Sequence, residues 1–179
     1  MIFKPDLYRA VLGRFASGVT AVATVHEGEF HGTTVSAFSA VSLDPPLVMI
    51  CINNDSDINN LISRSGKFSV NILSEKQVEI SRTLAQKNLN PDQSSKLQGI
   101  KYSLGENGCP IFDDILAFLE CDVHKVIIAG DHIIYIGEVG RGGLSDKIDK
   151  PLIHFEGKYS SIWWFWAYYG YFKVITSNY

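Results

Sequence analysis

Hydroxyl-bearing and small residues are concentrated between Gly32 and Ser42, in the run Gly-Thr-Thr-Val-Ser-Ala-Phe-Ser-Ala-Val-Ser. Small side chains let a flat polar ring approach the backbone, where N–H and C=O groups can pair with its carbonyl oxygens and ring nitrogens. Hydroxyls are also common on half-exposed strands, so an ordinary solvated strand edge would carry the same residues. The run alone therefore leaves a ligand site and a solvated edge as alternatives.

Histidine and carboxylate residues gather around Gly130-Asp131, where Asp122, His124 and His132 are close in sequence. Their spacing matches no known ligand pattern and they flank one predicted turn, so we expect no metal site. The chain also contains no G-x-S-x-G motif, which disfavours a hydrolase. The glycine-rich run at 140–143 lacks the spacing and context of a dinucleotide-binding fingerprint, and we interpret it as a loop.

Charge and cysteine content exclude further classes of protein. The chain has 16 Lys and Arg against 19 Asp and Glu, without a basic run, so nucleic acid is not an expected partner. Cys51, Cys109 and Cys121 are an odd number without a C-x-x-C pair, which argues against disulfides and structural zinc. No export signal is visible, and no apolar run approaches about 18 residues. We therefore expect a cytoplasmic protein without a membrane partner.

Apolar periodicity predicts many strands and a few helices. Helical spacing runs from Pro5 to about Gly18 and over residues 58–65, and Ser74 with Gln77 has the pattern of a capping box before a further helix. The predicted strands cover residues 19–25, 30–36, 41–43, 47–52, 68–73, 116–129 and 133–139. Turns rather than long helices join these strands, so the pattern favours a closed antiparallel barrel over a parallel sheet.

One domain accounts for residues 1–179, because no repeat, low-complexity tract or linker interrupts the chain. Residues 86–108 are polar and weakly periodic, which is typical of a long surface excursion. From about residue 160 the chain forms an aromatic extension, densest over residues 163–172. This extension is too short to span a bilayer, and its composition favours packing at a subunit boundary, with membrane-interface binding as the alternative.

Several stretches, taken together and in order, resemble the flavin reductase components of two-component flavin-dependent monooxygenases, whose fold is the FMN-binding split barrel. These stretches are residues 14–20, 32–48, 51–54, 68–74, 130–132 and 151–159. The resemblance implies a mainly β protein with flanking helices, built as an antiparallel Greek-key split β-barrel. It also implies a homodimer that transfers hydride from NADH or NADPH to FMN or FAD and supplies reduced flavin to a separate oxygenase.

Carried over by position, the resemblance implies a flavin site made mainly of two segments, one beside the ring and one beside the ring and ribityl chain. The residues implied are Thr33, Thr34, Val35, Ser36, Ala37, Ser39, Cys51, Ile52, Asn53, Asn54, Ser56 and Arg82. Ser56 would face the phosphate, while Ile58 stands where the family often has a further hydroxyl. Arg82 is the cationic candidate for the phosphate or adenylate, with a surface arginine as the alternative.

The residues that the resemblance implies for nicotinamide binding are His132, His154 and Tyr159. His132 follows the turn where the family places a histidine beside the nicotinamide; a polar hairpin residue is the alternative. Imidazole and phenol rings can stack on nicotinamide or adenine, although His154 and Tyr159 would also suit packing at a barrel rim. No protein nucleophile is required, because the two cofactors carry out the hydride transfer themselves.

Two other functions stay open on the sequence. A protein of the same fold could hold flavin or haem without turnover, as a carrier or electron-transfer protein. Outside the resemblance, a small antiparallel barrel could carry an apolar ligand. The implied nicotinamide residues favour the reductase, since a carrier needs no second cofactor site. The sequence does not decide between FMN and FAD, or between NADH and NADPH.

Overall fold

The computed structural model describes residues 4–87, 95–147 and 149–162. The helices in these ranges are α1 (Pro5–Gly13), α2 (Ile58–Ser65) and α3 (Val78–Ala85), with the short 3-10 helix η1 (Glu75–Gln77). The strands are β1 (Ser17–Gly18), β2 (Thr20–His26), β3 (Glu29–Val35), β4 (Phe38–Leu43), β5 (Pro46–Asn53), β6 (Lys67–Ile72), β7 (Tyr102–Leu104), β8 (Pro110–Phe112), β9 (Ala117–Ala129), β10 (His132–Leu144), β11 (Leu152–Phe155) and β12 (Lys158–Ser161).

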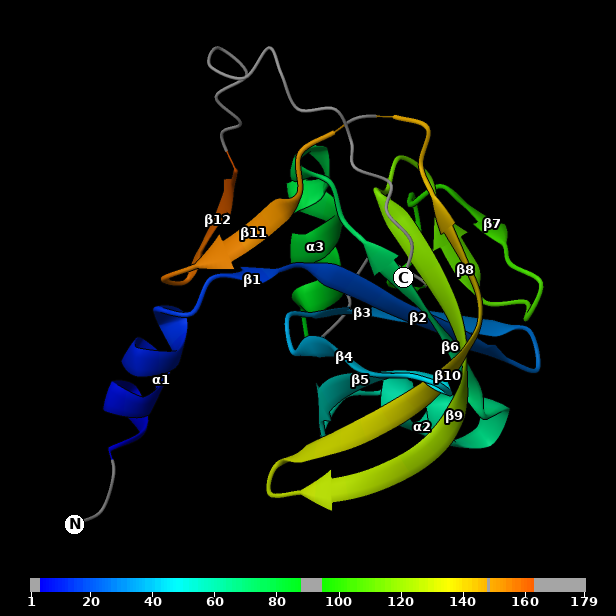
Figure 1. Ribbon diagram of the computed structural model, residues 1–179, viewed down its shortest axis with the longest axis horizontal. Coiled ribbons are helices and arrows are strands. Elements are labelled where there is room, and N and C mark those ends of the chain that lie inside the picture. The colour runs from blue at the N-terminus through cyan, green and yellow to red at the C-terminus, as the bar shows by residue number, and fades with distance from the viewer. Residues whose placement is uncertain (1–3, 88–94, 148, 163–179) are drawn as a thin grey trace.

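One antiparallel sheet contains most of these strands, in the order β3-β2-β6-β9-β10-β5-β4 (Figure 1). After β3 the chain turns away at Ser36-Ala37, and β4 pairs with β5 instead of with β3. Within the described ranges no ladder joins the two outer strands, so the expectation of a closed barrel is wrong. The mainly β, antiparallel split-barrel architecture implied by the resemblance is confirmed.

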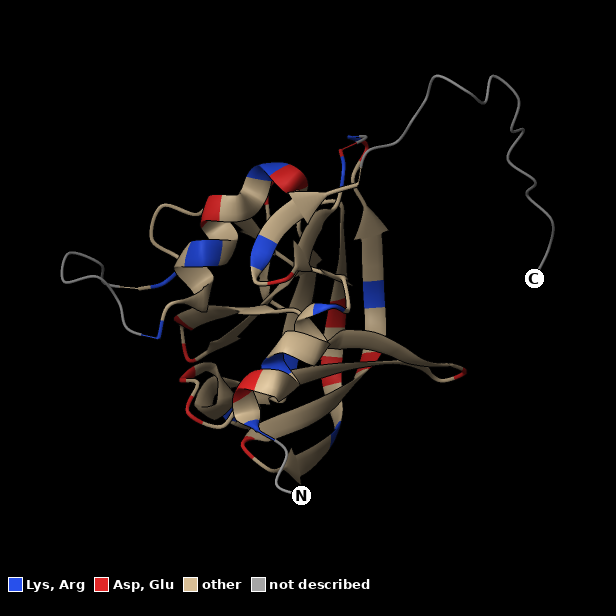
Figure 2. Ribbon diagram, turned by 90° about the vertical axis from the view of Figure 1, so that its left-hand side faces the viewer, with Lys and Arg blue, Asp and Glu red and all other residues tan. Residues whose placement is uncertain are grey.

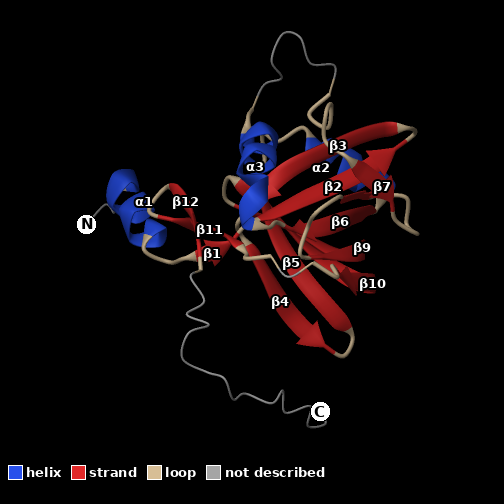
Figure 3. Cartoon of the chain, turned by 90° about the horizontal axis from the view of Figure 1, so that it is seen from above, coloured by secondary structure: helices blue, strands red, loops and turns tan. Residues whose placement is uncertain are grey.

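Two smaller sheets complete the strand pairing of the described residues. One has the order β1-β11-β12 and the other pairs β7 with β8. Figure 3 shows α1, β1, β11 and β12 together at one end of the molecule, and α3 beside β3. The predicted capping box is visible before α3, where the N–H of Ser74 donates to Oε1 of Gln77 (2.9 Å).

The glycine-rich run at 140–143 is not the loop that its composition suggested. It lies within β10 and pairs with β9. A Cβ on Gly143 would lie 2.5 Å from the ring of Phe118 on β9. Glycine is therefore needed here so that the strand can pass close to a large aromatic side chain, a requirement set by the partner strand rather than by the run itself.

Part of the predicted surface excursion is packed into the protein. Residues 88–94 of it lie outside the described residues, as does the aromatic extension from residue 163. Leu97, however, is only 4% exposed and joins a buried apolar cluster. The prediction of a surface excursion is therefore wrong for this part, which also contains strand β7.

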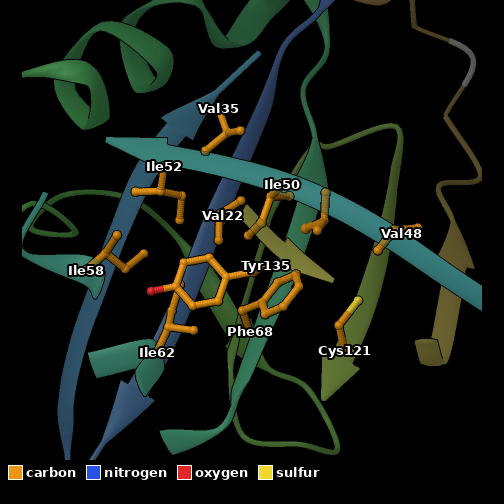
Figure 4. Close-up of a cluster of buried hydrophobic side chains, with 11 residues drawn as sticks. Val22, Val35, Val48, Ile50, Ile52, Ile58, Ile62, Phe68, Cys121 and Tyr135 are labelled. Carbon is orange, nitrogen blue, oxygen red and sulfur yellow. The ribbon is translucent and has the colours of Figure 1, made fainter. Parts of the chain in front are cut away.

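Two clusters of buried side chains form the core. One contains Val22, Ile50, Phe68 and Tyr135 and is closed on one side by α2 (Figure 4). The other contains Ala21, Leu73, Leu84 and Leu152. Strand β2 contributes to both, because alternate residues of a strand point to opposite faces of the sheet. Its residues from 20 to 24 are all buried, which places β2 between the two clusters.

Helix α1 stands apart from both clusters. It begins at Pro5, a favourable first helical position, and none of its residues is buried. Leu7, Val11 and Leu12 are each more than half exposed. The predicted amphipathic helix is confirmed, although it ends at Gly13 rather than near Gly18. Its apolar face is not covered by any residue that the structure describes.

Positive and negative residues are interspersed on the side of the molecule that Figure 2 shows. Several of them form exposed ion pairs, such as Arg64 with Glu27 (3.1 Å) and Lys76 with Asp149 (2.6 Å). Within the described ranges, no helix is long and apolar enough to cross a membrane.

Candidate ligand-binding site

A cavity of about 300 Å³ opens where β3 and β5 end beside α3. This volume is at the lower end of the range of ligand pockets, roughly 300–1,000 Å³. The sequence-predicted residues that line it are Thr33, Thr34, Val35, Ser36, Ala37, Cys51, Ile52, Asn53, Ser56 and His132. A backbone hydrogen bond from Cys51 N–H to the Ala37 carbonyl (3.0 Å) joins the two main segments. Residues that are distant in sequence therefore meet at one site.

The hydroxyls of Thr33 and Thr34 hold α3 against β3. Thr34 Oγ1 donates to the carbonyl of Ser81 (2.6 Å), and Thr33 Oγ1 donates to that of Leu84 (3.5 Å). Both hydroxyl protons are therefore used within the protein. Both threonines line the cavity, as predicted. Their hydroxyls fix the position of α3, which forms one wall of the cavity.

The loop after β5 is built around Asn53. The Asn53 side chain accepts from the N–H of Asp55 (2.9 Å), and its carbonyl accepts from the N–H of Ser56 (3.0 Å). From below the loop, Nδ2 of Asn59 on α2 donates to the carbonyls of Asn53 (2.8 Å) and Asn54 (3.3 Å). Oδ1 of Asn59 accepts in turn from the buried hydroxyl of Tyr135 (3.1 Å). The loop is thus anchored to the apolar core.

The same loop is bonded to the turn between β9 and β10. Asn54 donates from its N–H to the carbonyl of Asp131 (3.0 Å) and from Nδ2 to the carbonyl of Gly130 (3.1 Å). At the start of β10, Nδ1 of His132 lies 2.8 Å from Oδ1 of Asp131, and this hydrogen bond lowers the pKa of the Asp131 carboxyl. The His132 ring is therefore oriented by its neighbour while it lines the cavity.

Five sequence-predicted residues do not line this cavity: Ser39, Asn54, Arg82, His154 and Tyr159. Arg82 pairs with Glu79 on the same helix (2.5 Å) and lies over the ring of Tyr159, 5.7 Å from its centroid. The Tyr159 hydroxyl is hydrogen-bonded to Ser81 (2.9 Å), and its ring makes an edge contact with His154 at 5.9 Å. Arg82, His154 and Tyr159 thus form a separate group beside α3.

The cavity also contains residues that the sequence did not single out. They are Asp55, Asp57, Ala85, Gln86, Lys87 and Lys96. Lys96 is 6% exposed and comes from the polar segment after residue 86, whose sequence pattern gives no signal of burial. Close to it lies His31, whose Nδ1 is buried without a hydrogen-bond partner. Burial and the nearby Lys96 lower the pKa of His31.

A second hollow of about 570 Å³ lies beside α3 and η1. Its lining includes two lysine–aspartate pairs, Lys76 with Asp149 (2.6 Å) and Lys147 with Asp114. Because these four charged side chains already pair with one another, they are not free to pair with a charged ligand. In the described part of the chain, no group of three or more His, Cys, Asp or Glu residues is arranged to hold a metal ion.

The fold and the site together define an antiparallel split-barrel protein with a cavity where β3 and β5 end, lined by small and hydroxyl-bearing residues together with charged ones. The family model described as "Flavin reductase like domain" matches residues 12–162. The chain belongs to this family.

Individual relatives agree with this assignment. The chain is 38% identical over 156 residues to a flavin reductase from Pseudomonas putida, and the match covers 87% of this chain and 88% of that protein. It is 39% identical over 139 residues to a probable flavin reductase from Rhizobium meliloti (strain 1021), covering 77% of this chain. In that case the match spans only 43% of the relative.

Solved structures show the same similarity. Component B of nitrilotriacetate monooxygenase from Mycobacterium thermoresistibile superimposes with a TM-score of 0.81 at 39% identity, covering 88% of this chain and 86% of that one. The NADH:FAD oxidoreductase SgcE6 of Streptomyces globisporus, solved in complex with NAD and FAD fragments, gives a TM-score of 0.80 at 29% identity. There the coverage is 89% of this chain and 95% of that one.

Proposed function

We propose that this protein is an NADH-dependent flavin reductase that supplies reduced flavin to a separate oxygenase. The observation that carries the proposal is the meeting of segments 33–37 and 51–56 with His132 on one cavity. The similarity to a monooxygenase component and to an NADH:FAD oxidoreductase supports it.

The residues present fit a flavin. Ser36, Ala37 and Cys51 have small side chains, so a planar ring can reach the backbone beside them. The lining also contains Lys87 and Lys96, which suit the phosphate that a flavin nucleotide carries. The cavity thus combines a neutral wall for a ring with cations for an anion.

When both are bound, flavin and reduced nicotinamide supply the hydride chemistry between themselves. The part left to the protein is to hold the two rings at reacting distance and to limit the access of water. In this proposal segments 33–37 and 51–56 hold the flavin. His132, whose Nδ1 is occupied by Asp131, would contact the nicotinamide through Nε2. His154 and Tyr159 would contact the dinucleotide outside the cavity.

We also propose that the protein acts as a homodimer. Leu7, Val11 and Phe15 near α1, and Ile128 at the end of β9, are exposed by 53%, 55%, 79% and 80%. Large exposed apolar side chains favour burial against another surface, and a second copy would provide it. Sedimentation analysis should show a dimer at micromolar concentration; a monomer would contradict this part of the proposal.

The activity is tested by mixing purified protein with NADH or NADPH and an excess of FMN or FAD, and following the loss of reduced nicotinamide. We expect many turnovers with NADH. An absence of turnover with all four pairs would overturn the proposal. Stoichiometric reduction of a tightly bound flavin, without further turnover, would instead identify a flavin carrier.

A further inference from the structure

Lys96 is a buried lysine that has no counter-ion among the residues that the structure describes. Its exposed fraction is 6%, and no ion pair or hydrogen bond joins its ammonium group to the residues that the structure describes. Burial lowers the pKa of Lys96, while the more distant carboxylate of Asp57 acts in the opposite direction. An unpaired buried charge is unfavourable to the folded state, so its presence in a ligand cavity calls for an anion from outside the chain.

The backbone holds Lys96 in this position through its neighbour Leu97. Leu97 is buried in the apolar cluster that also contains Leu84 of α3. A Cβ on Gly32 would lie 3.0 Å from Leu97 Cδ2 and 3.2 Å from Leu84 Cδ2, so a larger residue on β3 would push against both leucines. With Leu97 fixed between β3 and α3, Lys96 is directed into the cavity rather than toward solvent.

The described carboxylates around Lys96 do not neutralise its charge, so an anionic ligand could pair with it. Asp57 and Asp55 line the cavity, but neither forms an ion pair with Lys96 within the described residues. Lys87 adds a second cation to the lining. The nearby His31 has a buried Nδ1 without a partner. Lys96 and His31 thus present polar atoms that have no partner among the residues that the structure describes.

We infer that Lys96 binds the phosphate attached to the ribityl chain of the flavin, a step that rests on the flavin site proposed above. Ser56, which lines the cavity with Lys96, belongs to the loop expected to face this phosphate. FMN and FAD both carry a phosphate at this position, and an ammonium group binds phosphate oxygens as a point charge. The cation expected from the sequence, Arg82, is already paired with Glu79.

The test compares ligands that differ in this phosphate. Dissociation constants of riboflavin, FMN and FAD are measured by flavin fluorescence for the wild-type protein and for Lys96→Met, which keeps the length of the side chain without its charge. FMN and FAD should bind about tenfold more weakly or worse to the variant, as expected for the loss of a charged hydrogen bond. Riboflavin should bind equally well to both proteins.

Two further variants keep the test decisive. Lys96→Arg retains the charge and should retain most of the preference for FMN over riboflavin. Lys76→Met removes an exposed lysine that is paired with Asp149 in the second hollow, and it should leave all three affinities unchanged. Inorganic phosphate should compete with FMN, but not with riboflavin, for the wild-type protein, and this competition should disappear in Lys96→Met.

If Lys96→Met weakens the binding of riboflavin and of FMN equally, the inference is overturned, because the lysine would then stabilise the cavity rather than bind a phosphate. Unchanged FMN affinity would overturn it as well, including the case in which the KM for NADH rises and the lysine serves the dinucleotide. A wild-type protein that binds no flavin would overturn the proposed function itself. Binding of flavin by the wild type therefore separates the two failures.

Discussion

Replacing Tyr135 by Phe should weaken flavin binding, although Tyr135 does not line the cavity. Its side chain is 1% exposed, and Figure 4 shows the hydroxyl pointing out of the apolar cluster on the side of Ile58. There it donates to Oδ1 of Asn59 (3.1 Å), whose Nδ2 supports the carbonyls of the cavity loop. The two loop carbonyls can only accept, so Nδ2 must face the loop, and the Tyr135 hydroxyl holds the carboxamide in place by donating to the Oδ1 on its other side.

The size of the effect follows from the loss of one hydroxyl in a side chain of otherwise equal shape. A neutral hydrogen bond contributes about 1 kcal/mol net, and an unpaired buried acceptor such as Asn59 Oδ1 costs about 1–3 kcal/mol. Phe no longer has to bury a hydroxyl, which offsets part of this loss. We expect the free energy of unfolding to fall by about 1–2 kcal/mol. The melting temperature should fall by about 2–8 °C.

Flavin affinity should fall with stability, because part of the lost energy belongs to the cavity loop. A three- to tenfold rise in the dissociation constant, equivalent to about 0.7–1.4 kcal/mol, is expected in fluorescence titrations. Thr24→Val is the matched control, since Thr24 is fully buried and its hydroxyl donates to the Lys67 carbonyl (2.7 Å) away from the loop. It should lower the melting temperature similarly and leave flavin affinity unchanged.

The reasoning also requires that Tyr135 acts through Asn59. In an Asn59→Ala background, Tyr135→Phe should have no further effect on flavin affinity, because the group that transmits the effect is gone. If Tyr135→Phe lowers stability but leaves the dissociation constant unchanged, the hydroxyl serves packing alone and the reasoning is refuted. The same follows if Thr24→Val weakens flavin binding as much.

Other consequences can be measured on single variants or on the native protein. Gly137→Ala should lower the free energy of unfolding by about 1–3 kcal/mol in urea denaturation, because a Cβ there would lie 2.5 Å from an aromatic ring of β6; full stability would contradict this. His132→Ala should raise the KM for NADH and leave flavin affinity intact, and the reverse result would remove His132 from the nicotinamide site. At about pH 8, Cys51 alone should react with a thiol reagent in the native protein, because it is only half-buried whereas Cys109 and Cys121 are buried. Burial raises the pKa of all three thiols, that of Cys109 to about 11 and that of Cys121 to about 12. Reaction of all three native thiols would show that the strands carrying them open readily.

The two main segments of the cavity could be predicted because their signal is local. Residues 33–37 combine hydroxyl-bearing and small side chains, and residues 51–56 surround the end of a strand that the apolar run at 47–52 predicts. Their meeting depends on distant pairing, since β5 lies between β4 and β10 and the N–H of Cys51 reaches the Ala37 carbonyl. The resemblance supplied that long-range information, which periodicity does not contain.

Lys96 could not be predicted, because its distinguishing property is burial. That burial comes from Leu97 packing between Gly32 and Leu84, three positions that no local pattern connects. Arg82 was the more natural cationic candidate, since it lies on a helix in the matched region. A glutamate three residues earlier on the same helix face satisfies its charge. The opening of the sheet was missed for a similar reason, since it depends on where β4 finds its partner.

Asn54 joins the loop beside the cavity to the turn that carries His132, through both its N–H and its carboxamide. A ligand that immobilises the loop therefore restricts the turn too, and a second ligand that binds the turn has less conformational entropy to lose. Such coupling is reciprocal, so each ligand raises the affinity for the other by the same factor. If flavin and nicotinamide bind as proposed, this one asparagine would favour the state in which donor and acceptor are bound together over either half-filled state.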